Sequence, residues 1–314
     1  MGGSMNKSRP LPLYQKPWLS LDDQVYQLQS RGMVIADKQV ATDFLRHVNY
    51  YRFSGFCLAF ESSRHQFHKG VTFEQVKHAY DFDRTLRDIV TEALEIVELD
   101  FRCAVAYHFG NQYGAFGHRE TANFFRKFDH VKWMNKLYNE AMRSKERFVT
   151  HFKTTYSGFP DIPVWVVTEI MSFGALSHMC KGMLKCDKKI IAQRYNLQPL
   201  DWVSWLHHLT YVRNLCAHHG RLWDRILSIK PQLPHAKVWQ QPYMPGNNRL
   251  FTTLMILNYI MVRCPAVVAF ATEWRSRVEK LIANPPAVAN ATQLMGLAAN
   301  WQTHPLWKST SLAN

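Results

Sequence analysis

The sequence feature that most constrains the fold is a long apolar repeat with helical spacing between residues 72 and 109. Its main apolar residues recur mostly at intervals of three and four: Leu86, Ile89, Val90, Leu94, Val97, Phe101 and Val105. This spacing places apolar side chains on one face of an α-helix. Thr72 and Gln75 form a capping-box pattern at its start. The repeat therefore predicts either one long helix or two helices separated near residues 81–83.

Helical patterns also dominate the rest of the chain. Helix starts are indicated by N-cap residues and by proline in the first turn, at Ser20 with Asp23, at Asp37, and at Asp161 with Pro163. The predicted helices cover residues 21–31, 38–53, 129–156, 164–179, 200–219, 248–264 and 265–282. Because alternating apolar and polar runs are weak throughout, the predicted fold class is all-α.

The length of 314 residues and the apolar content of 47% allow a substantial buried core. Residues 1–4 have the character of a cloning remnant. Residues 5–70 are interpreted as an N-terminal helical segment, and residues 71–314 as the main helical domain with the C-terminal helices. We expect these two parts to pack as one compact unit.

The cellular setting follows from what the sequence lacks. No secretory signal is recognisable, and the apolar stretch at 250–262 is too short for a membrane span, so it predicts a buried helix. The six cysteines have no metal-ligand spacing and are interpreted as free thiols in a reducing cytosol. We therefore expect a cytoplasmic protein without membrane contact.

The chain is strongly basic, with 38 Lys and Arg against 24 Asp and Glu and a net charge of +14. Such an excess favours polyanionic partners, nucleic acids above all. Two alternatives stay open at this point: acidic membrane surfaces, and a charge that serves only solubility.

The segment YVRNLCAHHGRLWDR, residues 211–225, combines many hydrogen-bond donors with apolar flanks. On a helix, Asn214 and His218 are four positions apart and share a face. A histidine exchanges a proton near neutral pH, and the planar guanidinium of Arg213 can hold two phosphate oxygens. Asn214 can orient either the histidine or the substrate. The segment thus predicts a site for an anionic substrate.

These groups suffice to cleave RNA without a metal ion. The 2′-hydroxyl is the internal nucleophile, so the protein needs only to move protons and stabilise charge on phosphorus. One histidine does not easily act as base and acid on opposite sides of the phosphate, which predicts a homodimer with a composite site. His219 is the alternative second group, although adjacent helical residues point about 100° apart. The pattern R-N-x-x-x-H is weak by itself, because an arginine and a histidine can also brace a helix end.

Metal and cofactor sites are not indicated. The chain has no Gly-rich phosphate loop and no H-E-x-x-H or G-x-S-x-G motif. His65 and His68 lie in a predicted loop without nearby carboxylates. The histidine pairs at 207–208 and 218–219 lie in a segment that also carries Arg213, Arg221 and Arg225, which repel a cation. We therefore expect neither a metal nor another cofactor.

The motif and several longer blocks together resemble one known family. RNLCAHHGRLW resembles the R-x4–6-H motif of the HEPN superfamily, in the form of the Abi (abortive infection) family of AbiD- and AbiF-like proteins. Four other blocks resemble that family in order and spacing: KPWLSLDDQVYQLQSRGMVI, VNYYRFSGF, FEQVKHAYDFDRTLRDIVTEALEIVELDFRCAVAYHFGNQYG and PVWVVTEIMSFGALS. The resemblance runs from about residue 16 to beyond residue 223. After about residue 225 it is weaker and rests only on the general character of the sequence.

The resemblance implies a HEPN-type helical bundle with additional N-terminal and C-terminal helices. It implies a metal-independent endoribonuclease of bacterial antiphage defence, which works as a homodimer. Some relatives bind a structured non-coding RNA in a toxin–antitoxin-like arrangement, so the implied partners are target RNA and a cognate non-coding RNA. Carried onto this chain, Arg213 and His218 are the catalytic pair, and Asn214 fills the polar position after the arginine.

Further residues are candidates for supporting roles. Those beside the catalytic site are His219, Arg221, Glu98, Arg102 and Glu169, and those for RNA binding are Tyr50, Tyr51, Arg52, Lys132, Lys136, Arg143 and Arg147. Each has an alternative structural interpretation. Glu98 and Arg102 can be a simple intrahelical ion pair, and Glu169 needs a partner, such as a motif arginine, if it is buried. The segment NYYRFSG can be a packing element that ends a helix. The lysines and arginines of the predicted helix 129–156 can simply form its solvated face.

Two other functions remain open from the sequence. The same basic groove can hold a structured RNA without cutting it, which would make the protein an RNA-binding regulator. A module that binds another defence protein is the third interpretation, and it would show little salt dependence because few phosphates are engaged.

Overall fold

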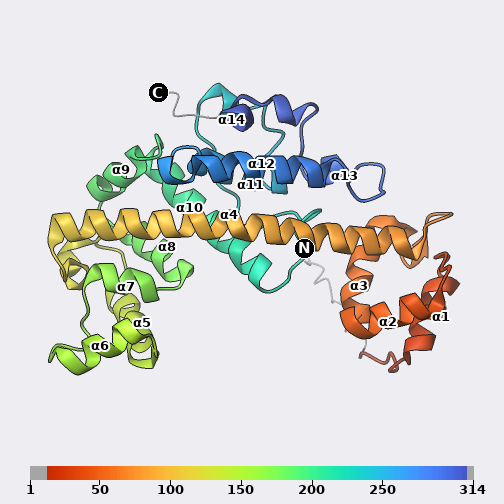
Figure 1. The fold of residues 1–314 in the computed structure, drawn as a ribbon, viewed down its shortest axis with the longest axis horizontal. Helices are drawn as coiled ribbons and strands as arrows, with labels where there is room; N and C mark the ends of the chain where they lie inside the picture. The colour runs from red at the N-terminus through yellow and green to blue at the C-terminus, as the bar shows by residue number, and fades with distance from the viewer. Residues whose placement is uncertain (1–12, 310–314) are drawn as a thin grey trace, which may run out of the picture. The chain divides into compact units, whose positions relative to one another are not determined.

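The computed structural model describes residues 13–309, and within them the fold is all-α, as predicted (Figure 1). The helices are α1 (Leu21–Ser30), α2 (Lys38–Val48), α3 (Tyr50–Cys57), α4 (Phe73–Tyr113), α5 (His130–Arg143), α6 (Arg147–Thr155), α7 (Val164–Ile170), α8 (Phe173–Gly182), α9 (Lys185–Gln193), α10 (Pro199–Ala217), α11 (Leu250–Met261), α12 (Val268–Ile282), α13 (Ala291–Leu294) and α14 (Pro305–Lys308). The described chain also has one antiparallel hairpin, β1 (Glu61–Ser63) and β2 (Gln66–Phe67). The suggested cloning remnant at 1–4 lies outside the described residues.

The predicted start signals are confirmed where the side chains bond to the helix backbone. Ser20 accepts the Asp23 N–H at 3.1 Å, and Asp37 accepts the Gln39 N–H at 2.8 Å. Thr72 and Gln75 each accept the other's backbone N–H, at 3.2 and 2.9 Å, which is a complete capping box. After this box, α4 runs for 41 residues as one helix, so the alternative of two helices near 81–83 is wrong.

Three predicted helices are interrupted, each at a residue whose side chain bonds to nearby backbone. Asn49, with φ 69°, ends α2 and accepts the Tyr51 N–H at the start of α3. Ser144 separates α5 from α6, and Ser172 caps α8 and separates it from α7. Asparagine and serine compete with helical bonding in this way. The hairpin, helix α9 and the two short helices of the tail were not predicted from the sequence.

The chain divides into two compact units, and the boundary falls within the α4 sequence, between Tyr80 and Asp81. The first unit holds α1 to α3, the hairpin and the first turns of α4. Its core contains an aromatic cluster in which the ring of Phe44 lies 5.3 to 5.5 Å from the rings of Phe53, Phe73 and Tyr80. This cluster holds the start of α4 against α2 and α3.

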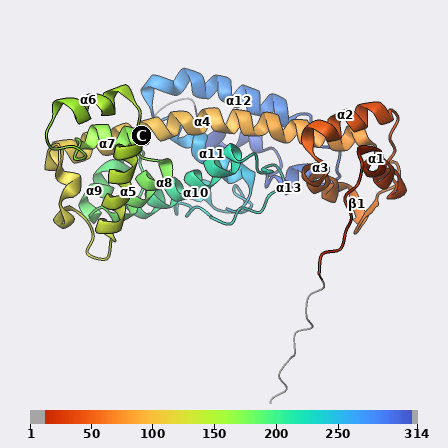
Figure 2. The ribbon, with the colours of Figure 1, turned by 90° about the horizontal axis from the view of Figure 1, so that it is seen from below.

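In the second unit, α12 runs beside α4 in both views (Figures 1 and 2). The Trp274 indole donates to the Ile89 carbonyl at 2.9 Å, and Arg277 pairs with Glu92 at 2.6 Å. Helix α11 is buried along its whole length, which confirms the predicted buried helix at 250–262. No single helix among residues 13–309 is long and apolar enough to span a membrane, and only the bent pair of α11 with 265–282 meets that test by length and composition.

Buried histidines in the second unit predict a loss of stability in acid. His208 is fully buried, donates from Nδ1 to the Ile229 carbonyl at 2.6 Å and accepts at Nε2 from the Thr253 hydroxyl at 2.9 Å. Burial lowers the pKa of His208 to about 4, and burial also lowers the pKa of His118 to about 4. The unfolded chain, with histidine near pKa 6.5, therefore binds more protons between pH 4 and 6.5.

We expect the contribution of these two histidines to the free energy of unfolding to be constant above pH 6.5 and to fall as the pH drops toward 4. Each histidine contributes a slope of about 1 kcal/mol per pH unit in that window. Denaturant unfolding at several pH values measures this. The His208→Gln variant keeps a donor and an acceptor but does not titrate, so its slope should be smaller. An unchanged slope in that variant would contradict the assignment.

Candidate functional site

The segment singled out in the sequence lies at the C-terminal end of α10. The helix ends at Ala217, but the N–H of the next residue, His218, still bonds to the Asn214 carbonyl at 3.0 Å, so both residues lie on one face, as predicted. Both side chains are exposed, and the Arg213 side chain is 35% exposed. The three residues are therefore open to a large ligand.

His219 does not continue the helix. Its φ is 54°, its N–H bonds to the Cys216 carbonyl, and the Gly220 N–H bonds to the Leu215 carbonyl at 2.7 Å. This is a Schellman cap with a histidine at the left-handed position, where glycine is usual. A Cβ at residue 220 would lie 3.2 Å from the Leu215 carbonyl oxygen, which explains the glycine there. The assumption that His219 is a helical neighbour of His218 is wrong for this reason.

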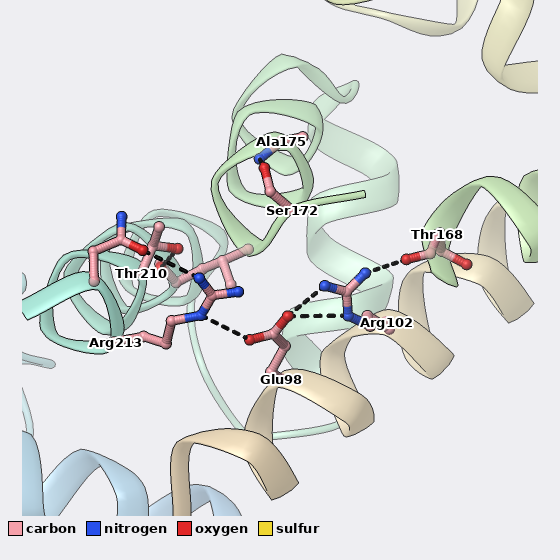
Figure 3. A network of polar contacts seen from close by, with 9 residues as sticks. Glu98, Arg102, Thr168, Ser172, Ala175, Thr210 and Arg213 are labelled. Carbon is pink, nitrogen blue, oxygen red and sulfur yellow. Dashed lines mark hydrogen bonds and ion pairs between the residues drawn. The ribbon is translucent and has the colours of Figure 1, made fainter. Parts of the chain in front are cut away.

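The Arg213 guanidinium is held by a chain of polar contacts that begins on α4 (Figure 3). Its Nε lies 3.6 Å from Glu98 Oε2, and its Nη1 donates to Asn214 Oδ1 at 3.3 Å. Glu98 also pairs with Arg102, which in turn donates to the Thr168 carbonyl on α7. The Glu98–Arg102 pair is thus both an intrahelical ion pair and an attachment for Arg213.

A cavity of about 340 Å³ lies between α4 and α10 beside this chain of contacts. Its lining residues are Thr91, Glu95, Glu98, Leu99, Arg102, Arg213 and Ala217. Two glutamates make this side of α10 unfavourable for a polyanion, although they suit an arginine. The guanidinium has five N–H donors, and the contacts with Glu98 and Asn214 use only some of them. The remaining donors are available to phosphate oxygens.

A second attachment, which the sequence analysis missed, fixes the chain just after the motif. The fully buried Asp83 carboxylate accepts the backbone N–H groups of Leu222 and Trp223, both at 2.8 Å, and pairs with the buried Arg87. Burial raises the pKa of Asp83 to about 6, while Arg87 and the two N–H groups act in the opposite direction. The carboxylate is therefore mostly ionised at pH 7.

Both attachments belong to one polar row along α4. Its members, spaced mostly by four, are Asp83, Arg87, Thr91, Glu95, Glu98 and Arg102. Thr91 bonds to the Cys216 side chain, so contacts with α10 and the following segment occur along most of the row. The sequence signal that reveals this row is a polar series at helical spacing inside a largely apolar helix.

Two other supporting candidates, Arg221 and Glu169, have contacts outside the chain of polar contacts that holds Arg213. Arg221 pairs with Asp224 at 2.8 Å. Glu169 is exposed rather than buried, so its expected need for a motif arginine does not arise. It lines a cavity of about 500 Å³ with Glu140 and Arg143, between α5, α6 and α7. Glu169 was expected to be buried because α7 is largely apolar, but it lies on the side of this short helix that faces solvent.

The residues suggested for RNA binding fall into two groups. In the first unit, Tyr50 accepts a hydrogen bond from Arg31 at 3.0 Å, whereas Tyr51 is 87% exposed and Arg52 is also exposed. In the second unit, the exposed cations lie on α5 and α6: Lys132, Lys136, Arg143 and Arg147. Among residues 13–309, no group of three or more His, Cys, Asp or Glu side chains could hold a metal ion. The six cysteines are free.

Comparison with known proteins identifies the family. A family model described as "Abi-like protein" matches residues 43–224, which is more than half of the chain. The match contains the polar row of α4 and the whole segment from Arg213 to Trp223. No curated protein and no solved structure matches. The chain therefore belongs to the family of Abi-like proteins.

Proposed function

We propose that this Abi-like protein is a metal-independent endoribonuclease of the HEPN type, acting in the cytoplasm in abortive-infection defence against phage. The observation that carries the proposal is the arrangement of Arg213, Asn214 and His218. An anchored guanidinium and an exposed imidazole lie within two turns of one helix end in a strongly basic chain. Family membership supports the defence role.

In the proposed reaction, the RNA 2′-hydroxyl attacks the adjacent phosphorus and the bond to the 5′-oxygen breaks. His218 transfers a proton as base or acid, and Arg213 stabilises the extra negative charge on the phosphorane-like transition state. Asn214 holds the guanidinium and positions the substrate. The product carries a 2′,3′-cyclic phosphate, and the other fragment has a 5′-hydroxyl.

The second candidate is an RNA-binding regulator that retains a cognate structured RNA without cutting it, in a toxin–antitoxin-like pair. The contact between Arg213 and Glu98 favours this alternative over cleavage, because a carboxylate beside the guanidinium opposes its stabilisation of a transition state, whereas RNA retention can be spread over the other cations of the chain. Both functions can also be successive states, with the bound RNA restraining the nuclease.

The test is incubation of the purified protein with labelled total RNA in EDTA, before and after bound RNA is stripped. Cleavage by the stripped protein, with 2′,3′-cyclic phosphate ends, would support the nuclease. A need for divalent metal or 3′-hydroxyl products would contradict it. Retention of one RNA species without any cleavage would favour the regulator.

The proposed enzyme is a homodimer, because one histidine does not serve both sides of the phosphate. Leu99, Cys103 and Tyr107 are exposed at successive turns of α4, and Leu99 also lines the cavity next to Arg213. Exposed apolar side chains in such a row are typical of association surfaces. We propose that this row packs against its counterpart in a second copy, which brings the two motifs together.

We expect Tyr107→Glu to convert the dimer to a monomer at micromolar concentration, because it places a charge in an apolar contact, and to remove cleavage with it. Size-exclusion chromatography with light scattering measures the mass. Tyr26→Glu is the control, since Tyr26 is 70% exposed on α1. A Tyr107→Glu monomer with full cleavage activity would disprove the composite site.

A further inference from the structure

A groove of about 490 Å³ lies between α8 and α10, distinct from the cavity that contains Glu98. Its lining includes Ser177, His178 and Lys181 of α8 and Leu200, Val203 and His207 of α10. The volume is sufficient for a small organic group such as a nucleotide. Neither the family match nor the motif assigns a role to it.

The face of α10 that lines the groove leads on to the motif. Its α10 residues occur at positions 200, 203, 207 and 210, and the same spacing leads on to Asn214 and His218. Figure 3 shows Thr210, which lines the groove, about one turn before Arg213. From His207 to His218 the helix advances about 16 Å, at roughly 1.5 Å per residue. An extended strand lying on this face therefore reaches both places.

The charges on the two sides of α10 differ in sign. The cavity on the α4 side is lined by Glu95 and Glu98, which repel a polyanion. On the α8 side, the charged groups that act on His178 are Lys132, Lys136 and Lys181 against the single carboxylate of Asp129. A polyanion bound at the motif is therefore directed toward α8.

The groove also offers contacts for a base. Leu200 is 69% exposed and lies with Val203 on the α10 side, where both present apolar surface. His178, Lys181 and His207 are exposed, so their side chains can reach phosphate oxygens or stack on a base. Imidazole rings on which bases can stack, together with the positive charge of Lys181 for phosphates, resemble the combination by which proteins hold single-stranded RNA.

We infer that the α8–α10 groove binds nucleotides of single-stranded RNA that flank the scissile phosphate. A base packs on Leu200 and Val203, while Lys181 and His207 contact phosphates. The inference rests on the proposed function for the position of the scissile phosphate, but RNA binding in the groove is measurable without cleavage.

The experiment uses the full-length His218→Ala protein and a labelled single-stranded RNA of about 12 nucleotides, followed by fluorescence anisotropy. We expect Lys181→Ala with His207→Ala to weaken binding at least tenfold and to reduce its salt dependence. The control removes two other exposed cations, Lys185 and Lys189 of α9, by alanine substitution and should change binding less than threefold. Equal losses in both variants, or none in the groove variant, would overturn the inference.

Cleavage separates failure of the groove from failure of the nuclease. In cleavage-competent protein, the groove variant should raise KM for the long RNA about tenfold and leave kcat, and the cleavage of a dinucleotide, unchanged. Groove-dependent binding without cleavage by any preparation would support the groove and contradict the nuclease. Cleavage of long RNA with unchanged KM in the groove variant would refute the groove alone.

Discussion

Replacing His218 by alanine is expected to lower the rate of RNA cleavage by about 10²–10⁴-fold, the usual contribution of a general acid or base. RNA binding should persist, because the substitution leaves Arg213 and the lysines of α5 and α8 in place. The side chain is exposed, so the thermal midpoint should shift little. Rates are measured under single-turnover conditions in EDTA, with binding measured separately.

Two other histidine variants sharpen this result. His235→Ala removes an exposed imidazole from the loop after α10 and should leave cleavage unchanged. His219→Gly removes the neighbouring imidazole and gives the left-handed position the residue that favours it, which should stabilise the fold by about 1 kcal/mol. Full activity in His219→Gly would exclude His219 as the second proton-transfer group. Full activity in His218→Ala would remove the basis of the proposed mechanism.

Replacing Asp83 by alanine is expected to destabilise the protein by about 3–5 kcal/mol, because the buried Arg87 loses its counterion. The N–H groups of Leu222 and Trp223 also lose their acceptor within the core. The segment that follows the motif then detaches from α4, so cleavage should fall as well, although no substrate contact has been removed. Denaturant unfolding measures the first effect.

Asp88→Ala provides the matched control, since Asp88 is an exposed carboxylate on the same helix and should change the stability by less than about 0.5 kcal/mol. Asp83→Asn keeps an acceptor for the two N–H groups and loses only the charge, so its stability should fall between those of the wild type and Asp83→Ala. Equal stability of Asp83→Ala and Asp88→Ala would show that the buried ion pair contributes nothing.

The parts of the fold that could be predicted from the sequence depend on local interactions. Ser20, Asp37 and Thr72 bond to backbone two or three residues away, so their position before an apolar repeat was sufficient. The helix breaks at Asn49, Ser144 and Ser172 are local as well. They were missed because the apolar periodicity continues across them, and only the φ and ψ values reveal the competing bonds.

The same distinction applies to the candidate site. The relation of Asn214 to His218 is one helical turn and was predicted correctly from spacing. The contact between Glu98 and Arg213 joins helices far apart in the sequence, and nothing in the sequence around Glu98 distinguishes it from an ordinary ion pair with Arg102. Asp83 is a still clearer case, because its role depends on two backbone N–H groups, which every non-proline residue possesses.

The bonds from Asp83 to Leu222 and Trp223 also set the order of events during protein synthesis. The partners are separated by 139 and 140 residues, and a ribosome adds about 5–20 residues per second. Several seconds to about half a minute therefore pass between the synthesis of Asp83 and the synthesis of Leu222 and Trp223. A nascent or prematurely terminated chain lacks the anchored segment. Under the proposed function, the Arg213–His218 motif is therefore anchored to α4 only after residue 223 has been made, late in the synthesis of the chain.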